Sequence, residues 1–138
     1  MAKKEIKTDL WVYELLKQAG VDLEPQGSSI IEINEALKTA SKKGTGKSGF
    51  PEYVGVVKDY LIVIEDKADL EKHIKQDVNG VISQISKDVT HYAVNGALFY
   101  GMHLARTTIS LTTTSMQKSV ATVVVETAFA LMVPTHSR

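Results

Sequence analysis

The 138-residue chain contains no cysteine, only three prolines and no long uninterrupted apolar run. The absence of cysteine excludes disulfide frameworks, cysteine-ligated zinc sites and thiol nucleophiles. No segment reaches the roughly 20 apolar residues of a membrane span, and no apolar stretch follows the charged N-terminus as in a secretory signal. We therefore expect a cytoplasmic protein with no membrane partner. Because 16 basic side chains balance 16 acidic ones, binding to nucleic acid requires a local basic patch.

The length suits a single domain, 1–138, that buries roughly two-thirds of the surface its unfolded chain exposes. Charge is distributed unevenly, since 107–138 contains only Lys118, Glu126 and Arg138 among the charged residues. Segments rich in β-branched residues in this tail predict strands, and Pro134 ends the last of them. These segments are 107–114, 120–125 and 128–133.

Two amphipathic helices are predicted in the first third of the chain. The first is capped at residues 8–9 and ends at Gly20. The second begins at Ser29, which has capping-box spacing with Glu32, and leads into the glycine-rich segment 42–49. The glycine content of that segment predicts a loop.

The hydrophobic period changes from helical to two after Pro51. This change predicts a β-hairpin of strands 52–57 and 60–67, with its turn at 58–59. Small residues at helical spacing over 89–104 predict a helix that lies close against the sheet.

A hairpin centred on that turn places Glu52 opposite Glu65, with the two Cβ atoms about 5 Å apart. Two opposed carboxylates are destabilising unless a positive charge lies beside them. Alternation places Lys67 on the same side of the strand as Glu65 and directs Asp66 to the other side. Two carboxylates beside a lysine suit a hard divalent cation and phosphodiester hydrolysis. A solvated ion-pair group at a strand end is the alternative interpretation.

At these residues the sequence resembles a known family. Segment 49–52, a hairpin and then 64–67 resemble the PD-(D/E)XK nuclease motif in its Pro-Glu … Glu-X-Lys form. The surrounding order of elements over 29–105 is similar to the N-terminal endonuclease domain of type I restriction-enzyme R subunits and of type IIG restriction-modification enzymes. Segments 36–44 and 92–100 contribute to this similarity. The resemblance implies an α/β fold with a restriction-endonuclease-like core, a central mixed β-sheet flanked by helices.

The resemblance also implies residue roles. Glu52 and Glu65 stand at the two acids that bind Mg²⁺ or Mn²⁺ in that family, and Lys67 stands at the lysine that positions the attacking water. A glutamate of the first core helix often joins such sites, and Glu35 is preferred here because Glu32 already has a capping explanation. A solvated glutamate on the helix face is the alternative for Glu35.

Three features depart from the family pattern. Glu52 replaces the aspartate of the motif name. Related nucleases often carry Gln-xxx-Tyr on the helix after the core strands, but Gly96 replaces the glutamine four residues before Tyr100. We therefore expect Tyr100 to be buried in the core. The tail 107–138 also lacks the glycine-containing strand expected after that helix.

The glycine-rich loop has two further interpretations. Its Lys42, Lys43 and Lys47 suit DNA phosphates, or they belong to a solvated turn. A nucleotide-binding P-loop would require glycine at position 41, where the chain has Ser41, and would follow a strand rather than a helix. The histidines lack metal-ligand spacing and are expected at the surface or on helix faces; they are His73, His91, His103 and His136.

Together these features predict a metal-dependent DNA endonuclease domain of a restriction-modification system. Its expected partners are DNA and the methyltransferase, specificity or motor parts of the same system. The charge-poor tail and the length suggest part of a longer restriction enzyme. The alternative function is a catalytically silent nucleic-acid-binding or interaction module with a nuclease-like fold.

Overall fold

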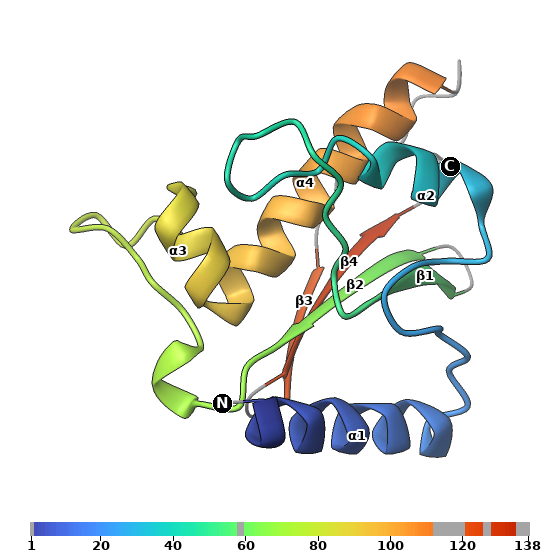
Figure 1. Cartoon of the computed structure of the whole chain (residues 1–138), viewed down its shortest axis with the longest axis horizontal. Helices are drawn as coiled ribbons and strands as arrows, with labels where there is room; N and C mark the ends of the chain where they lie inside the picture. Colours follow the sequence, from blue (N-terminus) through green and yellow to red (C-terminus); the bar gives the residue numbers. More distant parts are fainter. Residues whose placement is uncertain (1, 58–59, 112–120, 126–127, 135–138) are drawn as a thin grey trace.

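The computed structural model describes residues 2–57, 60–111, 121–125 and 128–134, in which helices cover both faces of a four-stranded sheet (Figure 1). The elements, in chain order, are α1 Ala2–Gln18, α2 Ile31–Leu37, β1 Tyr53–Val57, β2 Tyr60–Asp66, the short 3₁₀ helix η1 Leu70–Lys72, α3 Ser86–His91, α4 Ala93–Leu111, β3 Ala121–Val125 and β4 Ala128–Pro134. The α/β architecture with flanking helices is confirmed.

The strand order is β1-β2-β4-β3, so β2 and β4 form the middle of the sheet. All three pairings are antiparallel, which differs from the mixed sheet expected from the resemblance. In the hairpin, Val54 pairs with Val63 and Tyr53 with Ile64. The register predicted from the sequence is therefore confirmed, although the turn residues 58–59 lie outside the described part of the chain.

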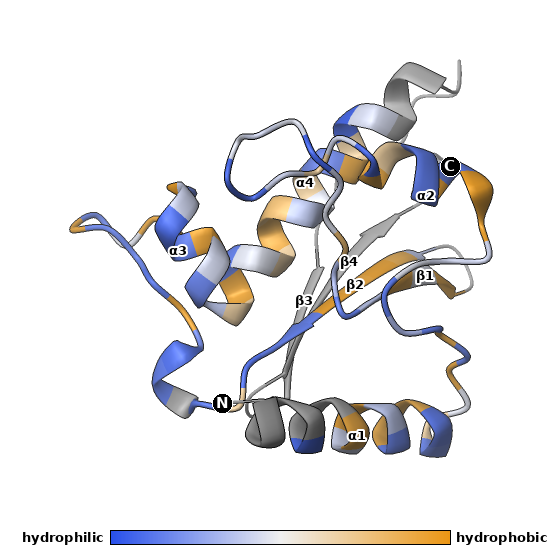
Figure 2. Cartoon of the chain, in the orientation of Figure 1, coloured by the Kyte–Doolittle hydropathy of each residue, from blue (hydrophilic) through white to orange (hydrophobic). Residues whose placement is uncertain are grey.

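Alternate residues of the hairpin contribute to two separate cores. Val54 and Val63 pack with α2 and α4 on one face of the sheet. On the other face Tyr53 and Ile64 pack with Val12 of α1. Figure 2 shows the hairpin strands as an apolar band and the loop after α2 as mainly hydrophilic. Burial of each large apolar side chain contributes about 1.5–3 kcal/mol, so the two cores fix which face each hairpin residue uses.

The first two helices differ from the predicted ones at their N-terminal ends. Helix α1 begins at Ala2, so the predicted cap at residues 8–9 lies within the helix. The capping box at Ser29 does not form, because the N-cap is Ile30 and no side chain caps the helix. Instead, the Ser28 hydroxyl accepts a hydrogen bond from the Ile30 amide at 3.1 Å, and Asn34 Oδ1 accepts one from the Ser28 amide at 3.0 Å.

The helix predicted over 89–104 is divided into α3 and α4 at Tyr92, which has an extended backbone with φ −118° and ψ 135°. The carbonyl of His73 accepts a hydrogen bond from the Val94 amide at 2.9 Å, which satisfies an amide at the new helix start. Val89 was predicted on the same helix as Tyr100, but it is a buried residue of the separate helix α3. Among the described residues, no helix is sufficiently long and apolar to cross a membrane.

Buried Asn95 holds the loop that precedes α3. Its side-chain amide donates hydrogen bonds to the carbonyls of Lys75 at 2.8 Å and Ser83 at 2.7 Å, and its Oδ1 accepts one from the Lys75 amide at 2.9 Å. Gly80 at the tip of the loop has φ +78°, a conformation that favours glycine. One side chain of α4 thus orders a long polar connection.

The described part of the tail is partly helical and partly in the sheet. The strand predicted over 107–114 is wrong over 107–111, which continues α4, and residues 112–114 lie outside the described part of the chain. Strands β3 and β4 confirm the other two predicted segments, and Pro134 is the last residue of β4. Since β4 pairs with β2, this segment belongs to the middle of the sheet.

Candidate active site

Glu65 is a carboxylate on the apolar face of the central strand β2. It follows Leu61 and Val63 at the period of two, and both of these side chains belong to the core under α2 and α4. Glu65 itself is only 2% exposed. A buried carboxylate requires a compensating charge or hydrogen bonds, because desolvation of an ionised group is costly.

The charge that compensates Glu65 comes from the glycine-rich loop. Lys42 Nζ lies 2.9 Å from Glu65 Oε2, and the Lys42 side chain is 16% exposed. A Cβ atom at Gly96 would lie 3.1 Å from both of these atoms. Gly96 therefore leaves the space in which the two charges meet. Breaking a buried pair of this kind typically costs about 3–5 kcal/mol.

Tyr100 lies beside this ion pair, one helical turn after Gly96 on α4. Lys42 Nζ lies 4.9 Å from the centre of the Tyr100 ring, in cation–π geometry. Burial raises the pKa of Tyr100, and the negative charges of Glu65 and then Glu52 raise it further. The expected burial of Tyr100 in the core is confirmed. Its phenol also lies within the electrostatic reach of both predicted metal ligands.

Glu52 lies immediately before β1, after buried Pro51, and is half-buried. The β1–β2 pairing ends at Tyr53, so Glu52 lies one residue beyond the ladder in which it was predicted to oppose Glu65. Its backbone is fixed from the other side, since its carbonyl accepts a hydrogen bond from the Gln26 amide at 2.8 Å. Since Tyr53 pairs with Ile64, Glu52 and Glu65 are the residues that directly flank the last pair of the β1–β2 ladder.

Lys67 follows the end of β2 and is half-buried. Within the described residues it forms no ion pair, and the lysine that neutralises Glu65 is Lys42. Its predicted position on the side of Glu65 follows from the alternation of the strand. The catalytic role of Lys67 stays a prediction.

Glu35 lies on the exposed side of α2, opposite the buried residues of that helix. Its Oε1 lies 2.6 Å from Lys38 Nζ, and the Glu35 side chain is 56% exposed. The described part of the chain contains no group of three or more His, Asp or Glu side chains able to hold a metal. The structure thus does not bring Glu35 together with Glu52 and Glu65, and its predicted role is untested.

The loop after α2 presents the other two lysines differently from Lys42. Lys43 and Lys47 are exposed, and both flank glycines with positive φ, Gly44 at +68° and Gly46 at +72°. The loop follows a helix and leads into β1, which is not the strand-to-helix setting of a P-loop. Ser41 closes the turn through its hydroxyl, which lies 2.9 Å from Thr45 Oγ1. The binding of DNA phosphates by Lys43 and Lys47 stays a prediction.

Two of the described histidines contact backbone carbonyls. His103 Nε2 lies 2.8 Å from the Ala36 carbonyl and 3.2 Å from Thr39 Oγ1, and so connects α4 to the end of α2. His91 Nδ1 lies 2.7 Å from the Lys87 carbonyl within α3. His136 lies outside the described residues.

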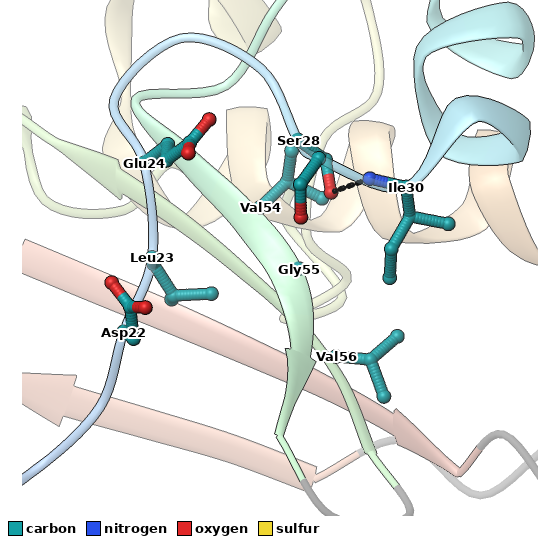
Figure 3. Close-up of a pocket in the computed structure, with 9 residues that line it drawn as sticks. Asp22, Leu23, Glu24, Ser28, Ile30, Val54, Gly55 and Val56 are labelled. Atoms are coloured by element: carbon teal, nitrogen blue, oxygen red, sulfur yellow. Dashed lines mark hydrogen bonds between the residues drawn. The ribbon is translucent and has the colours of Figure 1, made fainter.

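A separate small hollow of about 80 Å³ lies along the free edge of β1 (Figure 3). It is lined by the strand at Val54, Gly55 and Val56 and by the preceding loop, including Asp22 and Glu24. A Cβ atom at Gly55 would lie 2.5 Å from a Leu23 methyl carbon, so glycine permits the loop to approach the strand. This space is too small for a nucleotide, and Glu65 does not line it.

Two features of the site were not predicted from the sequence. The first is the contact between Lys42 and Glu65, which are 23 positions apart in the sequence. The second is the space that Gly96 leaves for this contact. The sequence signal was Gly96 itself, a glycine in the interior of a predicted helix, where it costs about 1 kcal/mol relative to alanine. Such a residue usually marks a close approach.

Sequence comparison supplies an independent finding. No protein-family model and no solved structure matches the chain. Among curated proteins, the type II restriction enzyme and methyltransferase RM.BcgI of Heyndrickxia coagulans is 36% identical over 111 residues, which are 80% of this chain. The match covers 17% of that relative's length. Over this stretch the chain is related in sequence to a restriction-modification enzyme.

Proposed function

We propose that this chain is the DNA-cleaving part of a restriction-modification enzyme, and that it hydrolyses phosphodiester bonds with Mg²⁺ or Mn²⁺. The observation that carries the proposal is the buried Glu65, which contacts the Lys42 ammonium and, like Glu52, flanks the last residue pair of the β1–β2 ladder. The similarity to RM.BcgI, whose name describes restriction and methylation, supports the choice of DNA as substrate and of a methyltransferase part as partner. We further propose that the hairpin, α2 and α4 form a core of the PD-(D/E)XK type.

The donor set fits a hard divalent cation. Glu52 and Glu65 would supply carboxylate oxygens, the ligands that Mg²⁺ prefers, and Mg²⁺ commonly uses only one or two protein carboxylates and several waters. When bound, such an ion lowers the pKa of a coordinated water and offsets charge on a phosphate. The lack of a third acidic ligand among the described residues is compatible with this mode of binding.

We assign each of these residues a role from its position in the fold. Glu52, just before β1, and Glu65, near the end of β2, would hold the ion. Lys67 donates hydrogen bonds that orient the attacking water or the phosphate oxygen. Lys43 and Lys47, exposed on the loop after α2, bind backbone phosphates of the DNA.

The test measures metal binding and DNA cleavage on the same variants. Calorimetry with Mn²⁺ should show binding by the wild-type chain, loss of binding in Glu65→Gln, and unchanged binding in Glu71→Gln, a matched exposed glutamate just after the site. DNA cleavage with Mg²⁺ should be lost in Glu65→Gln and Lys67→Met, and a Glu35→Gln variant reports whether that glutamate assists. Equal binding by the wild type and Glu65→Gln would refute the metal site.

A second function is favoured by one observation. Glu65 is already neutralised by Lys42, which is also what a purely structural ion pair would show. In that case the chain is a catalytically silent module that binds nucleic acid or a partner through the same fold. The two functions are distinguished by calorimetry, because a silent module binds no divalent ion through Glu52 and Glu65.

A further inference from the structure

Two cations compete for one buried carboxylate in the proposed site. Glu65 is the proposed metal ligand, and its Oε2 already lies 2.9 Å from the ammonium of Lys42. A divalent ion bound by Glu65 and Glu52 would stand within a few ångströms of that ammonium, in a region of low dielectric where like charges repel strongly. Glu65 can therefore contact Lys42 and a divalent ion at the same time only against the electrostatic repulsion between the two cations.

The groups around the Lys42 ammonium leave only one direction in which it can move. The Cβ position of Gly96 lies 3.1 Å from Lys42 Nζ, and the Tyr100 ring lies below the ammonium at 4.9 Å. The Lys42 side chain is 16% exposed, so the open direction leads to solvent. Its backbone is fixed, because the Lys42 carbonyl accepts a hydrogen bond from the Ser86 hydroxyl at 2.6 Å. Release thus requires only a change of side-chain rotamers.

We propose that Lys42 is a placeholder cation, which neutralises Glu65 in the metal-free protein and leaves it for the DNA-facing loop when the divalent ion binds. This inference rests on the proposed function. Lys42 is then a positioning residue that holds the Glu65 carboxylate in place before the metal is present. No such exchange is required if the pair is purely structural.

The exchange links the metal site to the DNA surface. Lys42 belongs to the same loop as exposed Lys43 and Lys47, so its release adds a third ammonium to that cationic loop. Coupling between two ligands is reciprocal. A phosphate that attracts Lys42 away from Glu65 therefore strengthens metal binding, and the metal strengthens phosphate binding.

The test labels lysines of the wild-type chain with an amine-acetylating reagent, with and without saturating Mg²⁺, and follows each residue by mass spectrometry. Without metal, Lys42 should react several-fold more slowly than its neighbour Lys43. Mg²⁺ should raise the rate at Lys42 at least threefold and leave Lys43 unchanged. In Glu65→Gln, Lys42 should react at the same rate with and without Mg²⁺.

Calorimetry on Lys42→Met and Lys43→Met provides the second arm, with Mn²⁺ as the ligand. Lys42→Met should bind Mn²⁺ several-fold more tightly than the wild type, and Lys43→Met should bind it equally. If the wild type binds metal but Lys42 labelling does not respond to it, the exchange is refuted and the metal site stands. If the wild type binds no metal, the proposed function fails and the exchange fails with it. The labelling arm needs no variant at Lys42, so it remains decisive should Lys42→Met not fold.

Discussion

Gly96→Ala is the substitution whose outcome the structure determines most sharply. Gly96 lies in the first turn of α4, and an added Cβ would stand 3.1 Å from Glu65 Oε2, Lys42 Nζ and the Val89 carbonyl oxygen. Contacts at this distance are tighter than ordinary van der Waals packing. The lysine can retreat, but the carbonyl of Val89 belongs to the α3 backbone, and Glu65 is enclosed.

Two effects of opposite sign determine the magnitude. Alanine is favoured over glycine in a helix by about 1 kcal/mol. Overpacking of a well-filled site costs about 1–3 kcal/mol. Since three atoms crowd the new methyl group and two of them are fixed, we expect the cost to exceed the gain. Gly96→Ala should lower the free energy of unfolding by about 1 kcal/mol.

Urea unfolding followed by circular dichroism measures this difference. A parallel thermal scan should show a fall in Tm of about 3–5 °C for a chain of this size. Repeating Gly96→Ala in a Lys42→Ala background removes one of the crowding atoms, so the penalty should shrink by about 0.5 kcal/mol or more. A stabilisation of about 1 kcal/mol in Gly96→Ala would show that helix propensity outweighs the crowding, and would refute the argument.

Two further predictions concern α4. Because the folded-state pKa of Tyr100 is raised, the unfolded chain loses its phenolic proton first, so stability should fall as the pH rises above about 10, by about 1.4 kcal/mol per pH unit. Urea titrations between pH 9 and 11 should show a shallower fall of stability in Tyr100→Phe but not in Tyr60→Phe, since Tyr60 is a 42% exposed residue. Equal slopes in the wild type and both variants would contradict the assignment. Asn95→Ala removes three partly buried hydrogen bonds of about 1 kcal/mol each, and should destabilise the chain by about 3 kcal/mol and speed amide exchange over 75–83. Unchanged exchange in that loop would show that Asn95 does not hold it.

The sequence predicted most reliably what depends on local pattern. The alternation after Pro51 and the turn position were sufficient to define the hairpin register, because a slip of one residue would turn every apolar side chain to the wrong face. The loop at Gly44 and Gly46 was likewise evident from composition. These features require only near neighbours in the chain.

Contacts between segments far apart in the sequence could not be predicted from these local patterns. The break at Tyr92 depends on the His73 carbonyl, which meets the start of α4 from another loop. The β-branched residues of 107–111 have strand propensity, but they continue a helix that packs on the sheet, so tertiary context outweighs a weak local preference. The sequence placed Lys67 as the positive charge beside Glu65, whereas the residue that pairs with Glu65 is Lys42, which only the folded loop brings there.

The hydrogen bond from the Gln26 amide to the Glu52 carbonyl helps to protect the outer edge of β1. Together with the bridge between Pro25 and Tyr53, it occupies the outer side of β1 at the end that bears Glu52. An unprotected strand edge invites pairing with another chain, and proline has no amide hydrogen with which to extend a ladder. This short segment thus shields the acidic end of the sheet from strand addition. A partner that reaches this edge of β1 must therefore contact it through side chains and loops rather than by strand pairing.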